Sequence, residues 1–228
     1  MVALEGPGEA LQGLVTVLDS IQLSADTVTS TLLQKLLLRD EVSVLVVTSR
    51  HSTQHYALLL RRLNLNVSKI GAEGRFRVLN TNGLCRLDEA ADRYTFDVHT
   101  LMKAVVSDVT SLAGATPPST SSYPRRCAVL FDDFVALLNA TGQHPQTVCR
   151  AIAGLSPVAF CRIVVVPQDV EDLDAVVTTL SCEATTVVRP LAPVSGNTAE
   201  CKAQMHILRR KFPPVRPESA VSPPERGA

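Results

Sequence analysis

The sequence lacks the charge imbalance that is typical of proteins dedicated to nucleic acids. Its 228 residues contain 22 basic and 22 acidic side chains, so the formal net charge is zero. Nucleic-acid binders usually carry a basic surplus that neutralises phosphates. Any RNA contact of this chain must therefore be local or shared with partner proteins.

Membrane and secretion signals are also missing. No apolar run reaches the roughly 18 to 20 residues that cross a bilayer. The first residues, MVALEGPGEALQG, lack the basic and apolar regions of a secretory signal. None of the six cysteines forms a CxxC pair, and several lie in apolar runs, as expected of buried, reduced thiols. We expect a soluble, intracellular protein.

Apolar residues make up 46% of the chain and charged residues 19%, which is enough apolar material for a packed core. The length favours one large domain. We expect a flexible N-terminus over residues 1–13 and one domain over 14–212. A stretch rich in Pro, Ser and Thr predicts a mobile loop over 113–126, and residues 213–228 are expected to form a disordered tail.

Short apolar runs alternate with segments of helical periodicity. The runs predict strands at 14–18, 42–47, 76–79, 127–131, 162–166, 185–189 and 204–210. Helices are predicted from about residue 26 and over 53–63, 100–112, 145–155 and 173–180. This alternation indicates a three-layer α/β/α domain, with a mostly parallel sheet and a C-terminal antiparallel hairpin.

In open α/β sheets ligands bind where the strands end, so the turns after the strands are informative. After its first strand an NTPase places a loop of the form GxxxxGK[ST]. Residues 19–27 read DSIQLSADT, with no glycine and no lysine. Each added carboxylate repels a phosphate 4 Å away by about 4 kcal/mol at an effective dielectric of 20. We therefore expect no nucleotide and no other cofactor, and a helix capped by Ser24 or Asp26.

Two acidic residues, Asp132 and Asp133, follow the strand over 127–131. They resemble the acidic strand end that holds magnesium in NTPases of this architecture. The phosphate and the loop hydroxyl that complete a magnesium shell are missing, so we interpret the pair as a degenerate acidic strand end. The expected roles are capping and polar interaction, with metal binding as the alternative.

No other pattern predicts a catalytic centre or a metal site. His51 and His55 have the spacing of a zinc helix but lack the Glu and the third ligand of such sites. The sequence contains no GxSxG elbow and no GxGxxG after a strand. We expect no catalytic residue and no enzyme activity.

Five basic residues are candidates for contact with RNA phosphates or with an acidic partner. They are Arg125, Arg126, Arg209, Arg210 and Lys211. For both the pair 125–126 and the run 209–211, the alternative is an ordinary solvent-exposed surface. The stretch 168–174, QDVEDLD, is acidic and would repel phosphate.

Several stretches together carry a resemblance to a known family. VLVVTSRHSTQHYALLLRRLNLNV is similar to the second strand and helix of Elongator complex subunit six, with Ser52, His55 and Tyr56 at matching positions. RFRV, AVLFDDFVALL and VVRPLAPVSGNTAECKAQMHIL resemble later stretches of that family. The resemblance extends over roughly residues 14 to 211. Where that family has Asp-Val-His-Gly before the last strand, this chain has Ala-Glu-Cys-Lys.

The resemblance implies a RecA-like domain without catalytic activity. Such a subunit joins Elongator subunits four and five in a ring of six, which docks on the catalytic subcomplex. The ring contacts tRNA weakly and jointly, and supports modification of the wobble uridine. The implied location is the cytoplasm, with the nucleus as a second location. Two alternatives stay open: Elongator subunit five, and an active RecA- or KaiC-type NTPase with an atypical nucleotide loop.

Overall fold

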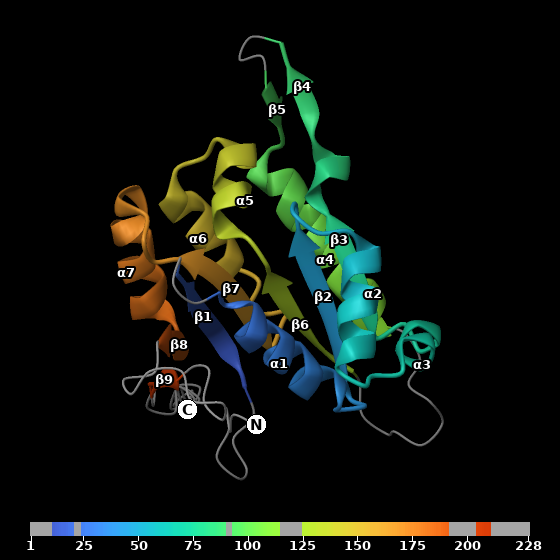
Figure 1. Ribbon diagram of the computed structural model, residues 1–228. Helices are drawn as coiled ribbons and strands as arrows, with labels where there is room; N and C mark the ends of the chain where they lie inside the picture. The colour runs from blue at the N-terminus through green and yellow to red at the C-terminus, as the bar shows by residue number, and fades with distance from the viewer. Residues whose placement is uncertain (1–10, 21–23, 90–92, 115–124, 192–203, 211–228) are drawn as a thin grey trace, which may run out of the picture.

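The computed structural model describes residues 11–20, 24–89, 93–114, 125–191 and 204–210. Seven strands form one sheet in the order β3-β2-β6-β7-β1-β8-β9 (Figure 1). They are β1 (Gly13–Asp19), β2 (Val42–Thr48), β3 (Phe76–Asn80), β6 (Arg126–Phe131), β7 (Cys161–Pro167), β8 (Thr186–Leu191) and β9 (Gln204–Arg209). All neighbouring strands are parallel except β9, which runs antiparallel to β8. The predicted sheet and its C-terminal hairpin are confirmed.

Helices cover both faces of the sheet. They are α1 (Asp26–Leu37), α2 (Thr53–Arg62), α3 (Val67–Ala72), α4 (Val98–Gly114), α5 (Phe134–Thr141), α6 (Pro145–Ala153) and α7 (Asp174–Glu183). Buried residues of α1, α2 and α3 belong to one hydrophobic core. Those of α4 to α7 belong to a second core on the opposite face. The protein is therefore a three-layer α/β/α domain.

Strand β2 shows why the sheet is buried on both sides. All seven of its residues are buried. Val44 and Val46 face the core under α1, whereas Leu45 and Val47 face the core under α4. Because side chains alternate along a strand, a continuous apolar run supplies both cores at once.

Gly13 begins β1 with a positive φ of 79°. A Cβ at this position would lie 2.5 Å from Cγ2 of Thr185. The Thr185 hydroxyl donates toward the carbonyl oxygens of Gln12, at 2.7 Å, and Leu14, at 2.9 Å, which holds that side chain in place. This position therefore requires glycine for both its backbone conformation and its space.

Two expected boundaries are wrong. The domain begins before residue 14, because Leu11 is buried in the core and β1 starts at Gly13. The predicted loop over 113–126 is too long at both ends, since α4 extends to Gly114 and β6 begins at Arg126. Residues 1–10, 115–124 and 211–228, which include the expected tail, lie outside the described residues.

Four short elements were not predicted: α3, α5 and the two strands β4 (Arg86–Asp88) and β5 (Arg93–Thr95). Strands β4 and β5 form a separate antiparallel pair that extends beyond the main sheet (Figure 1). Two 3-10 turns, η1 (Thr81–Leu84) and η2 (Glu171–Leu173), complete the secondary structure of the described residues. Among the helices described, none has the length and apolar character needed to cross a bilayer.

Candidate functional site

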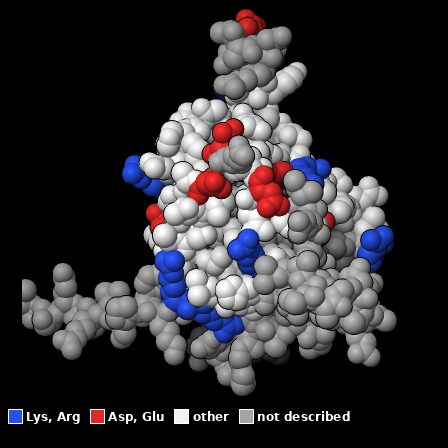
Figure 2. All heavy atoms as spheres, turned by 60° about the vertical axis from the view of Figure 1, so that its left-hand side comes forward, with Lys and Arg blue, Asp and Glu red and all other residues white. Residues whose placement is uncertain are grey.

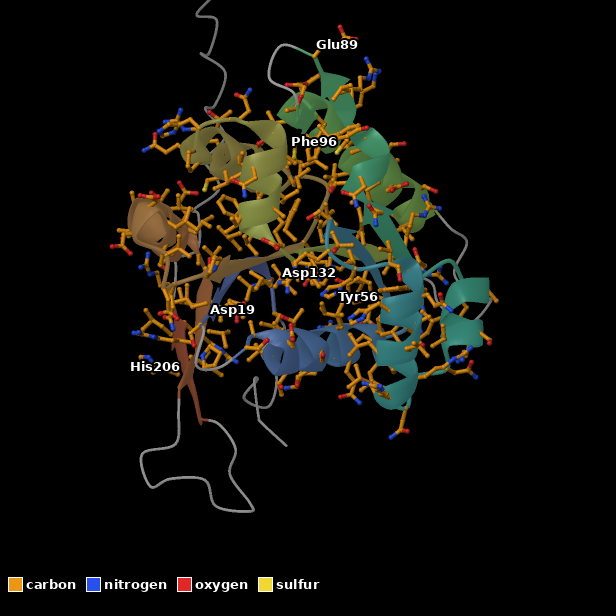
Figure 3. All side chains as sticks on the ribbon, turned by 45° about the horizontal axis from the view of Figure 1, so that its top comes forward. Asp19, Tyr56, Glu89, Phe96, Asp132 and His206 are labelled. Atoms are coloured by element: carbon orange, nitrogen blue, oxygen red, sulfur yellow. The ribbon has the colours of Figure 1, made fainter. Side chains whose placement is uncertain are left out.

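The carboxyl ends of the parallel strands place the acidic candidate residues along one end of the sheet, which we call its carboxyl edge. Asp19 ends β1 and Asp132 follows β6. Tyr56 comes from α2, the helix that follows β2 (Figure 3). Ligands of open α/β sheets bind along this edge, so its side chains decide what the domain can hold.

At the end of β1 the protein's own carboxylate binds the start of α1. Oδ1 of Asp19 accepts a hydrogen bond from the N–H of Ala25, the N-cap residue of α1, at 2.7 Å. The expected cap by Ser24 or Asp26 is wrong, because the N-cap position is occupied by Ala25, which has no side chain that can cap the helix. Ser24 lies one residue before it, and its Oγ accepts from the N–H of Asp26 at 3.1 Å. Asp26 itself lies in the first turn, where its negative charge is favourable. Residues 21–23 of this turn are not among the described residues.

Asp132 is bound by side chains from the neighbouring strand and its helix. Its Oδ2 accepts a hydrogen bond from the Tyr56 hydroxyl at 2.6 Å and one from Oγ1 of Thr48 at 3.3 Å. Tyr56 is only 2% exposed. Burial, and then the nearby Asp132 carboxylate, raise the pKa of Tyr56 well above its ordinary value. The carboxylate thus ties β6 to β2 and α2.

Asp133 caps the next helix. Its Oδ1 accepts from the N–H of Ala136 at 2.9 Å, which makes it the N-cap of α5. Its Oδ2 lies 3.6 Å from Nε of Arg50. The two acidic residues therefore make the capping and polar contacts that we expected of them.

The histidines near this edge stack on each other. The rings of His51 and His55 are 4.1 Å apart and inclined by 10°. Nε2 of His51 lies 3.9 Å from Oδ2 of Asp132. The cap of α2 is Ser52, whose Oγ accepts from the N–H of His55 at 3.2 Å. Within the described part of the chain, no group of three or more His, Cys, Asp or Glu residues could hold a metal ion.

The basic candidates lie at the opposite end of the sheet, where the parallel strands begin, which we call its amino edge. Arg126 begins β6, and Arg209 pairs with Thr186 at the start of β8. Arg126 is exposed, and its guanidinium carbon lies 4.2 Å from the centre of the Phe160 ring. Nη1 of Arg210, also exposed, donates to the carbonyl of Cys182. Lys211 is outside the described residues.

Arg125 is a correction to the expected set. We expected it at the border of an exposed loop, but only 4% of it is exposed, and its Nη1 donates to the carbonyl of Glu73 at 2.5 Å. Its Nε and Nη2 atoms are buried without a hydrogen-bond partner. A guanidinium in this position is not available to an RNA phosphate.

Two groups of exposed charged side chains bear on the expected RNA contact. Exposed Asp169, Asp172 and Asp174 follow β7 at the carboxyl edge, whereas Arg126 and Arg210 lie at the amino edge. On the face shown in Figure 2, the acidic side chains gather in the upper half, whereas basic side chains lie in both halves. The carboxylates after β7 would repel phosphate, whereas the exposed guanidinium groups of Arg126 and Arg210 would attract it.

Comparison with known proteins places the fold. No protein-family profile matches the sequence, and no curated protein does. The structure is similar to that of a KaiC-like protein from the hyperthermophilic archaeon Pyrococcus horikoshii, with a TM-score of 0.57 and 9% identity, over 88% of this chain and 80% of the other. It is also similar to an uncharacterized protein from Pyrococcus horikoshii, solved with an unknown peptide, with a TM-score of 0.55 and 11% identity over 88% and 84% of the two chains.

The architecture and these similarities agree on a RecA-like domain. The expected fold class is confirmed. At 9% and 11% identity, the similarity concerns the fold alone, because one fold can have many functions.

Proposed function

We propose that this chain is a non-catalytic, RecA-like subunit of the Elongator accessory ring, in the position of subunit six beside subunits four and five. Its role there is positional: its surfaces bind neighbouring subunits, and the ring holds or releases tRNA while the chemistry takes place on the catalytic subcomplex. The main support for a non-catalytic role is the hydrogen bond that the Ala25 N–H donates to the Asp19 carboxylate.

That hydrogen bond occupies a group which a phosphate-binding loop would need. In P-loop proteins the backbone N–H groups before and at the start of the first helix bind phosphate, and a lysine reaches the terminal phosphates. Here the Ala25 N–H faces a carboxylate, and residues 19–27 contain neither lysine nor glycine. A triphosphate at this position would compete with Asp19 and be repelled by it.

The acidic strand end supports the same reading. In an NTPase this carboxylate faces the magnesium shell, whereas Oδ2 of Asp132 here binds Tyr56 and Thr48. Ser52 and Tyr56 belong to one stretch that resembles Elongator subunit six, and Asp132 belongs to another. The hydrogen bond between Tyr56 and Asp132 joins these two stretches in space, over 76 residues of sequence.

The charge distribution favours a shared RNA contact at the amino edge. The exposed guanidinium groups of Arg126 and Arg210 lie there, and the formal net charge of the whole chain is zero. Two such groups neutralise few phosphates, so the affinity of this chain alone should be low. Assembly in a ring would bring several weak contacts onto one tRNA.

Co-expression with Elongator subunits four and five tests the assembly. We expect one complex that contains all three chains in equal amounts, and we expect the chain to restore wobble-uridine modification in cells that lack subunit six. Rescue of cells that lack subunit five instead would assign it to that position. A chain that stays alone in both experiments contradicts the proposal.

An active NTPase is the second candidate, because the fold resembles that of a KaiC-like protein. Calorimetric titration of the purified chain with Mg-ATP separates the two, with an active KaiC-type ATPase as positive control. We expect no binding heat up to millimolar ATP. Micromolar binding would contradict the non-catalytic role and favour the NTPase.

The RNA contact has its own test. We expect Arg126→Glu with Arg210→Glu to weaken tRNA binding by the assembled ring, and to do so more at low salt. Lys103→Glu, a charge reversal at an exposed site on α4, is the matched control. Equal loss of binding in both variants would remove the amino edge from the RNA site.

A further inference from the structure

The hairpin of β4 and β5 stands apart from the rest of the fold. It is inserted between β3 and α4 and extends beyond the carboxyl edge of the sheet, with Glu89 at its tip (Figures 1 and 3). Its two strands pair only with each other among the described residues. A two-stranded pair of this kind is marginally stable in water unless something else supports it.

The base of the hairpin is firmly attached. Phe96, directly after β5, is 5% exposed and belongs to the core, and its N–H donates to the carbonyl of Ala140 on α5 at 3.0 Å. The next residue, Asp97, accepts at Oδ2 from the N–H of Thr100 in α4 at 3.0 Å. On the other side, Leu84 packs against the same core. The base is therefore fixed, and the strands beyond it are presented in a set direction.

One face of the hairpin is apolar and exposed. Leu87 and Tyr94 are directly opposite each other in the register, so their side chains share a face. Leu87 is 52% exposed and Tyr94 is 68% exposed. The other large apolar residues exposed in the described part of the chain are not cross-strand partners of one another. Isolated exposed apolar residues are normal, but an adjacent pair on a projecting element is typical of a contact surface.

The charge near the tip indicates the chemistry of the partner. From Arg86 to Arg93 the hairpin sequence reads RLDEAADR and carries three carboxylates and two arginines, which leaves a net charge of −1. Glu89 is exposed there. An RNA backbone would be repelled by such a tip, whereas a basic protein surface would be attracted.

We propose that the β4–β5 hairpin is a protein-docking element: Leu87 and Tyr94 enter an apolar pocket on a partner subunit, and basic residues around that pocket face the acidic tip. A fixed base lowers the entropy lost on binding, because the element is already held in position. Tyr is enriched at sites that contribute most of the binding energy, since one ring buries a large area with few rotatable bonds. The choice of Elongator as the source of the partner rests on the proposed function, but the docking role does not.

Binding to purified Elongator components gives the first test. The full chain is titrated against subunits four and five, and the assembled ring against the catalytic subcomplex. We expect Leu87→Ser and Tyr94→Ser each to weaken one of these interactions by about 10- to 30-fold. Leu38→Ser is the matched control, because Leu38 is 65% exposed but far from the hairpin in sequence. All three variants should keep the melting temperature of the unchanged chain, since the substituted side chains are exposed.

Reversal of the tip charge separates a protein partner from RNA. We expect Glu89→Lys to weaken the same interaction at low salt and to have little effect at high salt, because screening removes contacts between exposed charges. Tighter binding by Glu89→Lys, together with RNA in the complex, would overturn the docking of a protein.

Photo-cross-linking in cells keeps the proposal testable if Elongator is not the partner. A photoreactive phenylalanine replaces Tyr94 in the full chain, and another replaces Leu38 as control. We expect one protein to be cross-linked from position 94 and none from position 38. The cross-link should disappear when Leu87→Ser is added to the chain. It should form again when the cross-linked protein and the chain are purified separately and mixed. If this protein is not an Elongator subunit, the docking element stands and the proposed function fails. No cross-link at position 94, or the same cross-link at position 38, overturns the docking element.

Discussion

Replacement of Tyr56 by Phe tests whether the Asp132 carboxylate has a structural role in holding β6 against β2 and α2. The variant removes one hydroxyl and keeps the ring, which is 2% exposed in the core. It deletes the 2.6 Å hydrogen bond to Asp132 and leaves that carboxylate with the longer contact from Thr48 at 3.3 Å. Hydrogen bonds to charged groups contribute about 1.5–3 kcal/mol. We expect a loss of about 2 kcal/mol in the free energy of unfolding, and a fall of roughly 4–8 °C in melting temperature for a domain of this size.

The same variant should change the alkaline limit of stability. Because the pKa of Tyr56 is raised in the folded state, the folded protein keeps this proton while the unfolded chain loses it above about pH 10. Fewer protons are then bound by the unfolded state, so the free energy of unfolding falls as the pH rises past that point. Tyr56→Phe removes this contribution, so stability should decline less steeply in alkaline buffer.

Urea unfolding at a series of pH values measures both effects. Tyr94→Phe is the matched control, because it removes the hydroxyl of a tyrosine that is 68% exposed and should change neither quantity. Equal stability of the two variants, or an unchanged alkaline slope in Tyr56→Phe, would refute the structural role assigned to this hydrogen bond.

Two further predictions concern other positions. Gly13→Ala should lower the free energy of unfolding by about 1–3 kcal/mol, because Gly13 has a positive φ and an added Cβ would clash with Thr185. Gly83→Ala is the control and should cost far less, because an added Cβ there meets nothing within 4 Å. Equal losses for the two variants in urea unfolding would contradict the role of Gly13. Burial raises the pKa of the Cys127 thiol to about 12 and that of Cys149 to about 11, whereas Cys182 is exposed. At pH 8 N-ethylmaleimide should therefore modify Cys182 long before the other two, and peptide mapping that finds the buried thiols labelled first in folded protein would refute this order.

Much of the fold could be predicted because the central strands carry their signal locally. Runs such as the one from Val44 to Val47 are apolar throughout, which is the pattern of a strand covered on both faces. The short elements lack such a signal. Strands β4 and β5 have three residues each, too few for an alternating pattern, and α3 has six.

Helix α5 was missed although its ends were marked in the sequence. Its residues, FVALLNAT, are nearly all apolar and continue from an apolar strand, so helical periodicity is hidden. The usable signals were Asp133 at the N-cap and Gly142 after the last turn, where φ is 59°. Reading these two residues as caps would have placed the helix between them.

The candidate site was predictable in kind but not in its contacts. The sequence identifies the acidic end of β6, but nothing local indicates that a tyrosine 76 residues earlier donates to it. The missed burial of Arg125 has the same origin. Its neighbours in sequence are those of an exposed loop, whereas its burial depends on contact with Glu73, 52 residues away.

The sheet separates two hydrophobic cores that share strands but have different helices above them. Side chains on opposite faces of the sheet rarely touch, so the effects of substitutions in the two cores on the free energy of unfolding should be nearly additive. One side of the molecule can then accumulate changes while the other conserves its packing. In the ring proposed above, this separation would let each contact region change without loss of the common framework.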